Sequence, residues 1–216
     1  MRTITIEGPL GPFHVPDEDP RTREGCIALS REVWGRDIAP GEYDHPELPT
    51  DGVYVVLDIG AGWGAFAVWA AKRWPGVAIL AYEPHEEAAQ LCLRNTINMN
   101  CVVFGSAVTT DKGAVLNGCE DWGAWRTHNE KSGRIVPTIH PAALPPCDVI
   151  KIDCEGCEAE VLGHYGHWER VRAVLWEFHT PDLRKECRDI LLARGFRPLA
   201  ETPEERGYGP NVWVRA

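Results

Sequence analysis

The fold of this chain is decided by the stretch VYVVLDIGAGWG at residues 53–64. Its first part is an apolar run rich in valine and bounded by glycine, which is typical of a strand buried on both faces. Three alternating glycines follow, and a helical pattern of apolar residues then runs from Phe66 to Trp74, where Pro75-Gly76 ends it. Glycines at a strand-to-helix turn let a ligand approach the backbone, and the helix N-terminus offers N–H groups to a carboxylate or phosphate. The stretch therefore predicts the floor of a small-molecule site in an open α/β sheet.

Two cofactors suit glycines of this kind, the dinucleotide NAD and S-adenosylmethionine (SAM). The spacing Gly60-x-Gly62-x-x-Ala65 satisfies the loose dinucleotide fingerprint, and Glu83 ends the next predicted strand, where a ribose-binding acid belongs. Asp58 favours SAM, because a carboxylate at the strand end can meet the ammonium of a methionine moiety but repels a pyrophosphate. A third glycine after one intervening residue favours SAM as well, and no stretch resembles a separate substrate domain for a hydride acceptor. NAD stays the alternative.

The composition is that of a soluble globular protein, with 216 residues, of which 44% are hydrophobic and 25% charged. The formal net charge is −10 without a Lys/Arg cluster, which disfavours a nucleic-acid substrate because an acidic surface repels the phosphate backbone. We expect a cytoplasmic protein without membrane contact, since the sequence shows no signal-peptide pattern and no apolar run of membrane-spanning length. The eight cysteines fit reduced, buried thiols, and Cys154-x-x-Cys157 lacks the second pair that a zinc site needs.

Residues 1–50 are expected to form an N-terminal extension, and residues 51–216 the main domain. The extension combines alternating runs typical of a β-hairpin (residues 3–15), a short helix (residues 23–34) and a Pro-rich loop that reaches Thr50. It could cover a cofactor and shape the substrate pocket, or it could be a packing cap on the sheet. A polar stretch of the main domain carries Trp122 and Trp125, either as a substrate-stacking lid or as the packed interior of an Ω-type loop.

Strands and helices alternate through the main domain, which predicts a doubly wound α/β fold. The expected strands cover residues 53–59, 77–83, 101–104, 147–153 and 171–177, with an antiparallel closing pair at 196–200 and 211–214. Four of the parallel strands end in an acid, namely Asp58, Glu83, Asp153 and Glu177, and Ser106 stands at the matching point of the third. Ligands bind at that edge of doubly wound sheets, so we expect a polar, ligand-bearing rim there.

Over residues 53–180 the motifs resemble the class I SAM-dependent methyltransferases and, within them, the FkbM-type family. The residues that carry the resemblance are DIGAGWGAF (58–66), YEP (82–84), Asn95, Asn98 and Asn100, SAV (106–108) with DKG (111–113), IKIDCEGCE (150–158) and VLG (161–163). Gly62 stands where the family often has Asn, and Ile139-His140-Pro141 replaces a more usual Leu-Asp. The resemblance implies a mostly parallel, seven-stranded sheet of order 3-2-1-4-5-7-6.

The same resemblance implies SAM as the cofactor. The expected cofactor-binding residues are Asp58, Gly60, Ala61, Gly62, Gly64, Glu83, Ser106, Ala107 and Asp153. The glycines would shape the loop around the methionine part, and Glu83 would hold the ribose hydroxyls with both carboxylate oxygens. Ser106 and Ala107 would flank the adenine, while Asp58 would support the loop or the ammonium, directly or through water.

Methyl transfer from a sulfonium is an in-line displacement that gains most from alignment, and a hydroxyl nucleophile also gains from a base. The catalytic candidates on the rim are Asp153, Glu155, Glu177 and His179. His179 has an intrinsic pKa suited to base work near neutrality, but it could instead be a structural hydrogen-bond partner. Asp153 and Glu155 could also bind a divalent metal that positions the acceptor.

The family is best known for O-methylation of hydroxyls on sugars and natural products, and some members act on amide nitrogen. We therefore expect a SAM-dependent O-methyltransferase whose acceptor is a small molecule, a sugar, a natural product or a peptide. The alternatives are an amide N-methyltransferase, an NAD-dependent oxidoreductase and a SAM-binding protein without catalysis.

Overall fold

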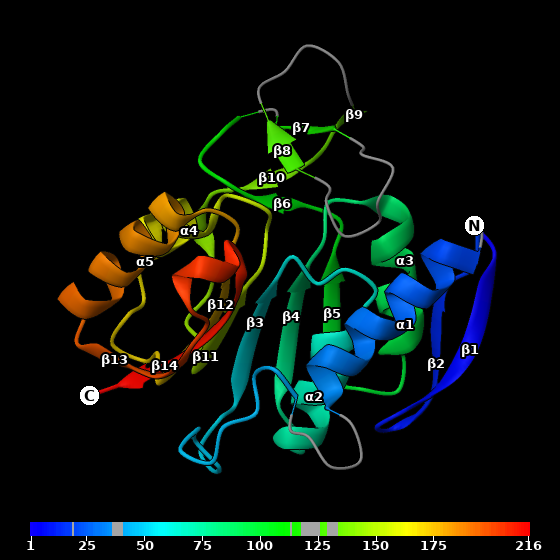
Figure 1. Cartoon of the computed structure of the whole chain (residues 1–216), viewed down its shortest axis with the longest axis horizontal. Coiled ribbons are helices and arrows are strands. Elements are labelled where there is room, and N and C mark those ends of the chain that lie inside the picture. Colours follow the sequence, from blue (N-terminus) through cyan, green and yellow to red (C-terminus); the bar gives the residue numbers. More distant parts are fainter. Residues whose placement is uncertain (19, 36–40, 113, 118–125, 129–133) are drawn as a thin grey trace.

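A seven-stranded sheet forms the centre of the molecule in the computed structural model, which describes residues 1–18, 20–35, 41–112, 114–117, 126–128 and 134–216 (Figure 1). The strands lie in the order β13-β14-β12-β11-β3-β4-β5. Their bounds are β3 Val55–Ile59, β4 Ala78–Tyr82, β5 Cys101–Phe104, β11 Val149–Ile152, β12 Ala173–Phe178, β13 Phe196–Glu201 and β14 Gly209–Arg215. The first five are parallel to one another, and β14 is antiparallel to both of its neighbours, β12 and β13. Counted along the chain, this is the predicted order 3-2-1-4-5-7-6.

Helices cover both faces of the sheet, as the doubly wound class requires. They are α2 (Ala65–Arg73) and α3 (Glu86–Asn95) on one face, and α4 (Glu158–His164) and α5 (Pro181–Ala193) on the other. Successive residues of a strand point to opposite faces. Along β3, Val56 therefore packs in one core cluster with Phe66 of α2, whereas Leu57 packs in another with Val161 and Leu191.

The face toward α2 changes character along the strands. It is apolar at Val56, Val149 and Leu175, which belong to one buried cluster. Two residues further along the same three strands, the same face carries Asp58, Lys151 and Glu177. Because side chains repeat every second residue on one face, a polar patch begins where this apolar core ends.

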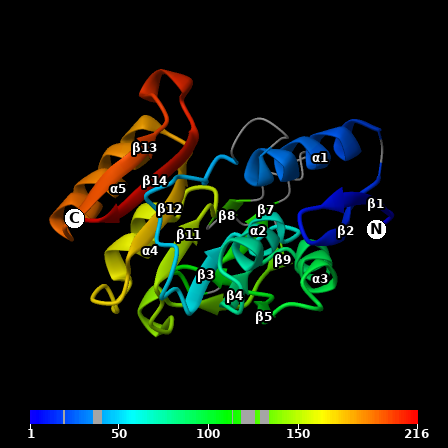
Figure 2. The same ribbon diagram turned by 90° about the horizontal axis from the view of Figure 1, so that it is seen from below.

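The N-terminal extension lies against α2 and α3 (Figures 1 and 2). It consists of the hairpin β1 (Thr3–Gly8) and β2 (Gly11–Pro16), the helix α1 (Pro20–Trp34) and a following loop. Asn95 of α3 joins it to the glycine turn, because its side chain exchanges two 2.8 Å hydrogen bonds with the backbone of His14 and donates to the Trp63 carbonyl. The Trp63 indole in turn donates to Ser30 of α1 over 2.8 Å.

Two small sheets lie above the carboxyl ends of the central strands (Figure 1). One pairs β6 (Ala107–Val108) with β10 (Thr138–Ile139), and the other joins β7 (Val115–Asn117), β8 (Arg126–His128) and β9 (Arg134–Ile135). Short 3-10 turns, η1 (Pro141–Ala143) and η2 (Glu204–Arg206), complete the described elements. Trp122 and Trp125 lie outside the described residues. Within the described ranges, none of the helices combines the length and the apolar character that crossing a bilayer requires.

Candidate functional site

A cavity of about 460 Å³ opens at the carboxyl ends of the parallel strands. Its volume lies within the range of about 300–1,000 Å³ that is usual for small-molecule sites. The glycine turn after β3, the residues that follow β4, β5 and β11, and the end of β12 form its floor and walls. The N-terminal extension closes one side with five residues, Leu29, Glu32, Val33, Glu42 and Tyr43.

The predicted site residues fall into two groups. Those that line the cavity are Gly60, Ala61, Gly62, Glu83, Ser106, Ala107, Asp153, Glu155, Glu177 and His179. Asp58 and Gly64 do not belong to this lining. Gly64 instead precedes α2 with φ +92°, and a Cβ at this position would lie 3.0 Å from the Cys92 sulfur. Close helix packing therefore explains this glycine.

The amides of the glycine turn are engaged within the protein. Gly60 and Ala61 donate to the Tyr82 carbonyl over 2.9 and 3.1 Å, and Gly64 donates to Ala61 over 2.9 Å. Gly62 donates over 2.8 Å to the side chain of Glu83. These four N–H groups of the turn therefore have acceptors within the protein.

Glu83 is held in one orientation by the backbone. Its two carboxylate oxygens each accept one 2.8 Å hydrogen bond, from the N–H groups of Gly62 and His85. The residue is only 7% exposed, and burial raises the pKa of Glu83 to about 7. Each oxygen keeps further acceptor capacity, so the carboxylate can receive hydroxyl groups of a ligand in the cavity.

Asp58 lies beneath the cavity rather than in it, because its side chain is completely buried. Its partner is Lys151, whose Nζ lies 3.4 Å from Oδ1 of Asp58 and 3.6 Å from Oδ2 of Asp153. The same ammonium donates to the Gly60 carbonyl. Burial raises the pKa of Asp58, and Lys151 opposes that shift. Asp58 therefore contacts the glycine turn through Lys151 and does not line the cavity.

Lys151 itself was not among the residues expected from the sequence. It is only 4% exposed and lines the cavity. Burial works to lower the pKa of Lys151, but the carboxylates of Asp58 and Asp153 outweigh burial and raise it. The signal that could have identified it is a lysine inside the otherwise apolar strand VIKI (149–152).

His179 is surrounded by carboxylates. Its Nε2 lies 3.3 Å from Glu155 and 3.6 Å from Asp153, and its Nδ1 lies 3.4 Å from Glu158. Burial alone would lower the pKa of His179, but Glu155, Glu158 and Asp153 outweigh it and raise the pKa to about 11. The His179 side chain is therefore a positively charged imidazolium at neutral pH, and this favours the structural role over that of a general base.

Glu158, which ends the Glu-Gly-x-Glu motif, folds the turn that carries these residues. Its completely buried carboxylate accepts from the N–H groups of Cys154 and Gly156 over 3.0 and 3.1 Å. Within this turn Glu155 adopts φ +58°. That conformation costs about 1–2 kcal/mol in residues other than glycine, and such strain is often found at functional sites.

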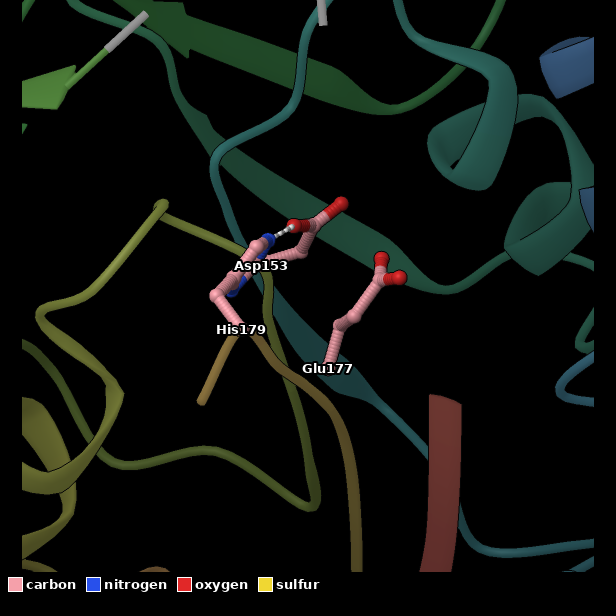
Figure 3. Close-up of side chains that lie close together, drawn as sticks. All are labelled: Asp153, Glu177 and His179. Atoms are coloured by element: carbon pink, nitrogen blue, oxygen red, sulfur yellow. Dashed lines mark ion pairs between the residues drawn. The ribbon is translucent and has the colours of Figure 1, made fainter. Parts of the chain in front are cut away.

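Carboxyl groups face one another across the cavity. Burial and the nearby Asp153 raise the pKa of Glu177 to about 8. Burial, Asp153 and Glu32 raise the pKa of Glu42 to about 7. Neither Glu32 nor Glu42 was expected from the sequence, because both come from the extension and no local motif marks them. Asp153, Glu177 and His179 together bring three possible ligand atoms within 4.8 Å of one another (Figure 3).

Comparisons with known proteins show which family this chain matches. The family described as "Methyltransferase FkbM domain" matches residues 55–198, about two thirds of the chain. The methyltransferase sdnD of Sordaria araneosa is 25% identical in an alignment of 201 positions that covers 71% of this chain and 77% of that protein.

Two solved structures give further examples. A precorrin-6y C5,15-methyltransferase from Geobacter metallireducens aligns with a TM-score of 0.46 and 15% identity, over 93% of this chain and 90% of its own. A ribosomal protein L11 methylase from Lactobacillus delbrueckii aligns with a TM-score of 0.47 and 13% identity, over 74% of this chain and 69% of its own. The family match and the observed strand order lead to one conclusion: the chain belongs to the FkbM family of SAM-dependent methyltransferases.

Proposed function

We propose that this methyltransferase transfers the methyl group of SAM to a hydroxyl of a small molecule or a peptide-borne acceptor. One observation carries the proposal: the glycine turn with Glu83 and a wall of carboxylates line the same cavity. The first part suits an amino-acid nucleoside, and the second can accept the proton that a hydroxyl loses.

The residues present fit SAM on their own geometry. Glu83 is aimed by two backbone donors and suits the ribose hydroxyls, while Ser106 and Ala107 line the part of the cavity assigned to the adenine. Gly60, Ala61 and Gly62 line the part assigned to the methionine moiety, and Asp58 acts on them through Lys151. When bound, SAM supplies an electrophilic methyl group on a sulfonium.

The chain contributes alignment and a proton acceptor. We assign the role of proton acceptor to the carboxylates of Asp153 and Glu177, because His179 keeps its proton at neutral pH. A carboxyl group with a pKa near the working pH, such as Glu177, is suited to general base catalysis. Alignment of the acceptor oxygen with the methyl group accounts for the rest of the rate acceleration. This effect reaches about 7–11 kcal/mol in favourable model reactions.

The test begins with cofactor binding. We expect calorimetry to show binding of SAM and of its demethylated product, and Glu83→Ala to weaken it by about tenfold or more, or about 1.4 kcal/mol. Glu169→Gln is the matched control, since this carboxylate is 70% exposed. Absence of binding by the wild-type protein would refute the proposal.

The atom that receives the methyl group is identified with SAM labelled with carbon-13 in its methyl group. Incubation with an acceptor panel should give a product whose methyl carbon has the chemical shift of an O-methyl group. We expect Glu177→Gln to retain SAM binding and to lose most of the turnover. An N-methyl signal would show that the methyl group goes to an amide nitrogen and not to a hydroxyl. Binding without turnover on any acceptor would favour a non-catalytic role.

A further inference from the structure

The ends of β11 and β12 bring together three potential metal ligands from two rigid strands. Asp153 directly follows β11 and His179 directly follows β12. Glu177 is the second-last residue of β12, and all three residues line the cavity. One ligand atom from each side chain lies within 4.8 Å of the other two. Figure 3 shows the Glu177 carboxylate and the His179 ring approaching Asp153 from neighbouring backbone.

The two oxygens of Asp153 have different environments. Oδ2 lies 3.6 Å from the Lys151 ammonium, which is itself paired with Asp58. Oδ1 lies 3.6 Å from Nε2 of His179, the ion pair that the dashed line in Figure 3 marks. Lys151 therefore positions Asp153 through one oxygen and leaves the other directed toward the cluster.

The imidazole ring of His179 is oriented by Glu158, on the side of its Nδ1. Nδ1 of His179 lies 3.4 Å from the completely buried Glu158, whose carboxylate is fixed by backbone N–H groups. Metal-binding histidines usually donate their second N–H to such a carboxylate, which sets the tautomer and directs the free nitrogen to the metal. Here Nε2 lies 3.3 Å from Glu155 and 3.6 Å from Asp153, so an ion would take the place of the Nε2 proton that these carboxylates hold.

A separate observation also indicates a ligand at this place. Tyr43 of the extension lines the same cavity and is only 1% exposed, yet its hydroxyl has no hydrogen-bond partner in the described part of the chain. The charges of Glu42, Asp153 and Glu177 all act on this hydroxyl. A buried hydroxyl without a partner is costly, and a ligand oxygen held between these groups would satisfy it.

We propose that Asp153, Glu177 and His179 bind a divalent first-row metal ion, with open positions toward the cavity for water and the acceptor oxygen. Two carboxylates balance the charge of the ion, and the mixed oxygen and nitrogen donors suit Mn²⁺ and its neighbours better than Ca²⁺. The inference rests on the proposed function in one respect: the ion would hold the acceptor hydroxyl and favour loss of its proton. Glu177 and Asp153 would then act on the acceptor through the ion.

Binding of Mn²⁺ is measured by electron paramagnetic resonance on the full chain, without SAM or an acceptor. We expect one equivalent to bind, with electron spin echo modulation from an imidazole nitrogen. Glu177→Gln should weaken Mn²⁺ by at least about tenfold, and His179→Gln should abolish the nitrogen signal. Glu177 has no ion pair among those described, so this variant should fold even if Asp153 variants do not.

The controls separate this inference from the proposed function. Glu169→Gln removes an exposed carboxylate and should bind Mn²⁺ like the wild-type protein. SAM affinity in the presence of a chelator should be unchanged, because the residues assigned to SAM, Glu83 and the glycine turn, are not ligands of the ion. Wild-type protein that binds SAM but not Mn²⁺, or Mn²⁺ binding that survives both Glu177→Gln and His179→Gln, would overturn the metal site and leave the methyltransferase assignment intact.

Discussion

At the scale of single residues, each of the three glycines of the turn is required for a different structural reason. Gly60 has φ +76°, and a Cβ there would lie 1.7 Å from the Asp153 carbonyl oxygen. Gly62 has φ +53°, and a Cβ there would meet no atom within 4 Å. Gly64 packs on α3. The motif therefore combines a close backbone approach, an open lining position and a helix contact.

These differences predict unequal costs of substitution. Gly60→Ala should lower the free energy of unfolding by about 2–4 kcal/mol, because it combines a left-handed conformation with a backbone clash. Gly62→Ala should cost only the conformational part, about 1 kcal/mol. Urea denaturation measures both. Equal losses in the two variants would show that the contact between Gly60 and Asp153 is not as close as described.

Glu83 links cofactor affinity to pH. Ribose hydroxyls donate to a carboxylate, so SAM should prefer the ionised form of a group whose pKa burial raises to about 7. Affinity should therefore rise by about tenfold between pH 6 and pH 8, following the ionised fraction. Calorimetry at both pH values measures the change, and Glu83→Gln should bind weakly with little pH dependence. A wild-type affinity that does not vary over this interval would contradict the ribose assignment.

Residue types and strand ends predicted the lining positions Glu83, Ser106 and Asp153, because the carboxyl ends of parallel strands share one edge. Asp58 was expected there too, but its side chain is completely buried beside Lys151, its register partner on β11. A sequence shows that an acid stands near the end of a strand, whereas its partner depends on the register of the neighbouring strand. Lys151 was not predicted as a site residue for the same reason.

At the scale of elements, β3 and β11 are joined by a charged pair at matched positions. Lys151 is paired in register with Asp58, and both side chains are almost completely buried. Lys151→Met should lower the free energy of unfolding by about 3–5 kcal/mol, because it leaves a buried carboxylate without its partner. The double variant Asp58→Asn with Lys151→Met should recover part of this loss.

A surface pair supplies the control for that prediction. Lys185 and Asp189 lie 2.8 Å apart on α5, with side chains 79% and 62% exposed. Lys185→Met should change stability by less than about 0.5 kcal/mol, since solvent screens exposed pairs. If Lys151→Met costs no more than Lys185→Met, the buried pair does not stabilise the contact between β3 and β11.

The N-terminal extension shows what local patterns miss. Its hairpin and helix follow from alternating and helical apolar positions, and the structure contains both. Its docking depends on Asn95 and Trp63, which lie far along the chain from the groups they bind. The extension both contributes to the core through Tyr43 and lines the cavity, so the two alternatives considered for it describe parts of one segment.

At the scale of the whole molecule, alternating strands and helices were enough to predict a doubly wound sheet, but not the order of its strands. That order came from the family resemblance, carried mainly by the motif at 150–158, and the topology confirms it. The carboxylate wall could be predicted only in part. Glu32 and Glu42 reach the cavity from α1 and the following loop, whose approach to the sheet edge no periodicity encodes.

The acidic cavity makes the stability of the whole chain depend on pH. Burial raises the pKa values of Glu42 and Glu83 from 4.5 to about 7, so between these limits the folded state binds protons that the unfolded state has lost. The free energy of unfolding must then fall as pH rises from about 4.5 to 7, by up to about 1.4 kcal/mol for each unit of raised pKa. The contribution of these two groups is constant above that window.

Thermal unfolding between pH 5 and pH 7.5 measures this slope. Glu42→Gln should flatten the curve and stabilise the protein most at the upper end of the interval, where the wild-type carboxyl is ionised and has no ion pair among the described residues. Glu169→Gln should keep the wild-type slope, because the Glu169 side chain is 70% exposed and lies outside the cavity lining. A Glu42→Gln curve parallel to the wild-type curve would show that this carboxyl is not confined by the cavity. The burial of these carboxyl groups is then a stability cost at neutral pH, which a bound cationic ligand would reduce by pairing with their charges.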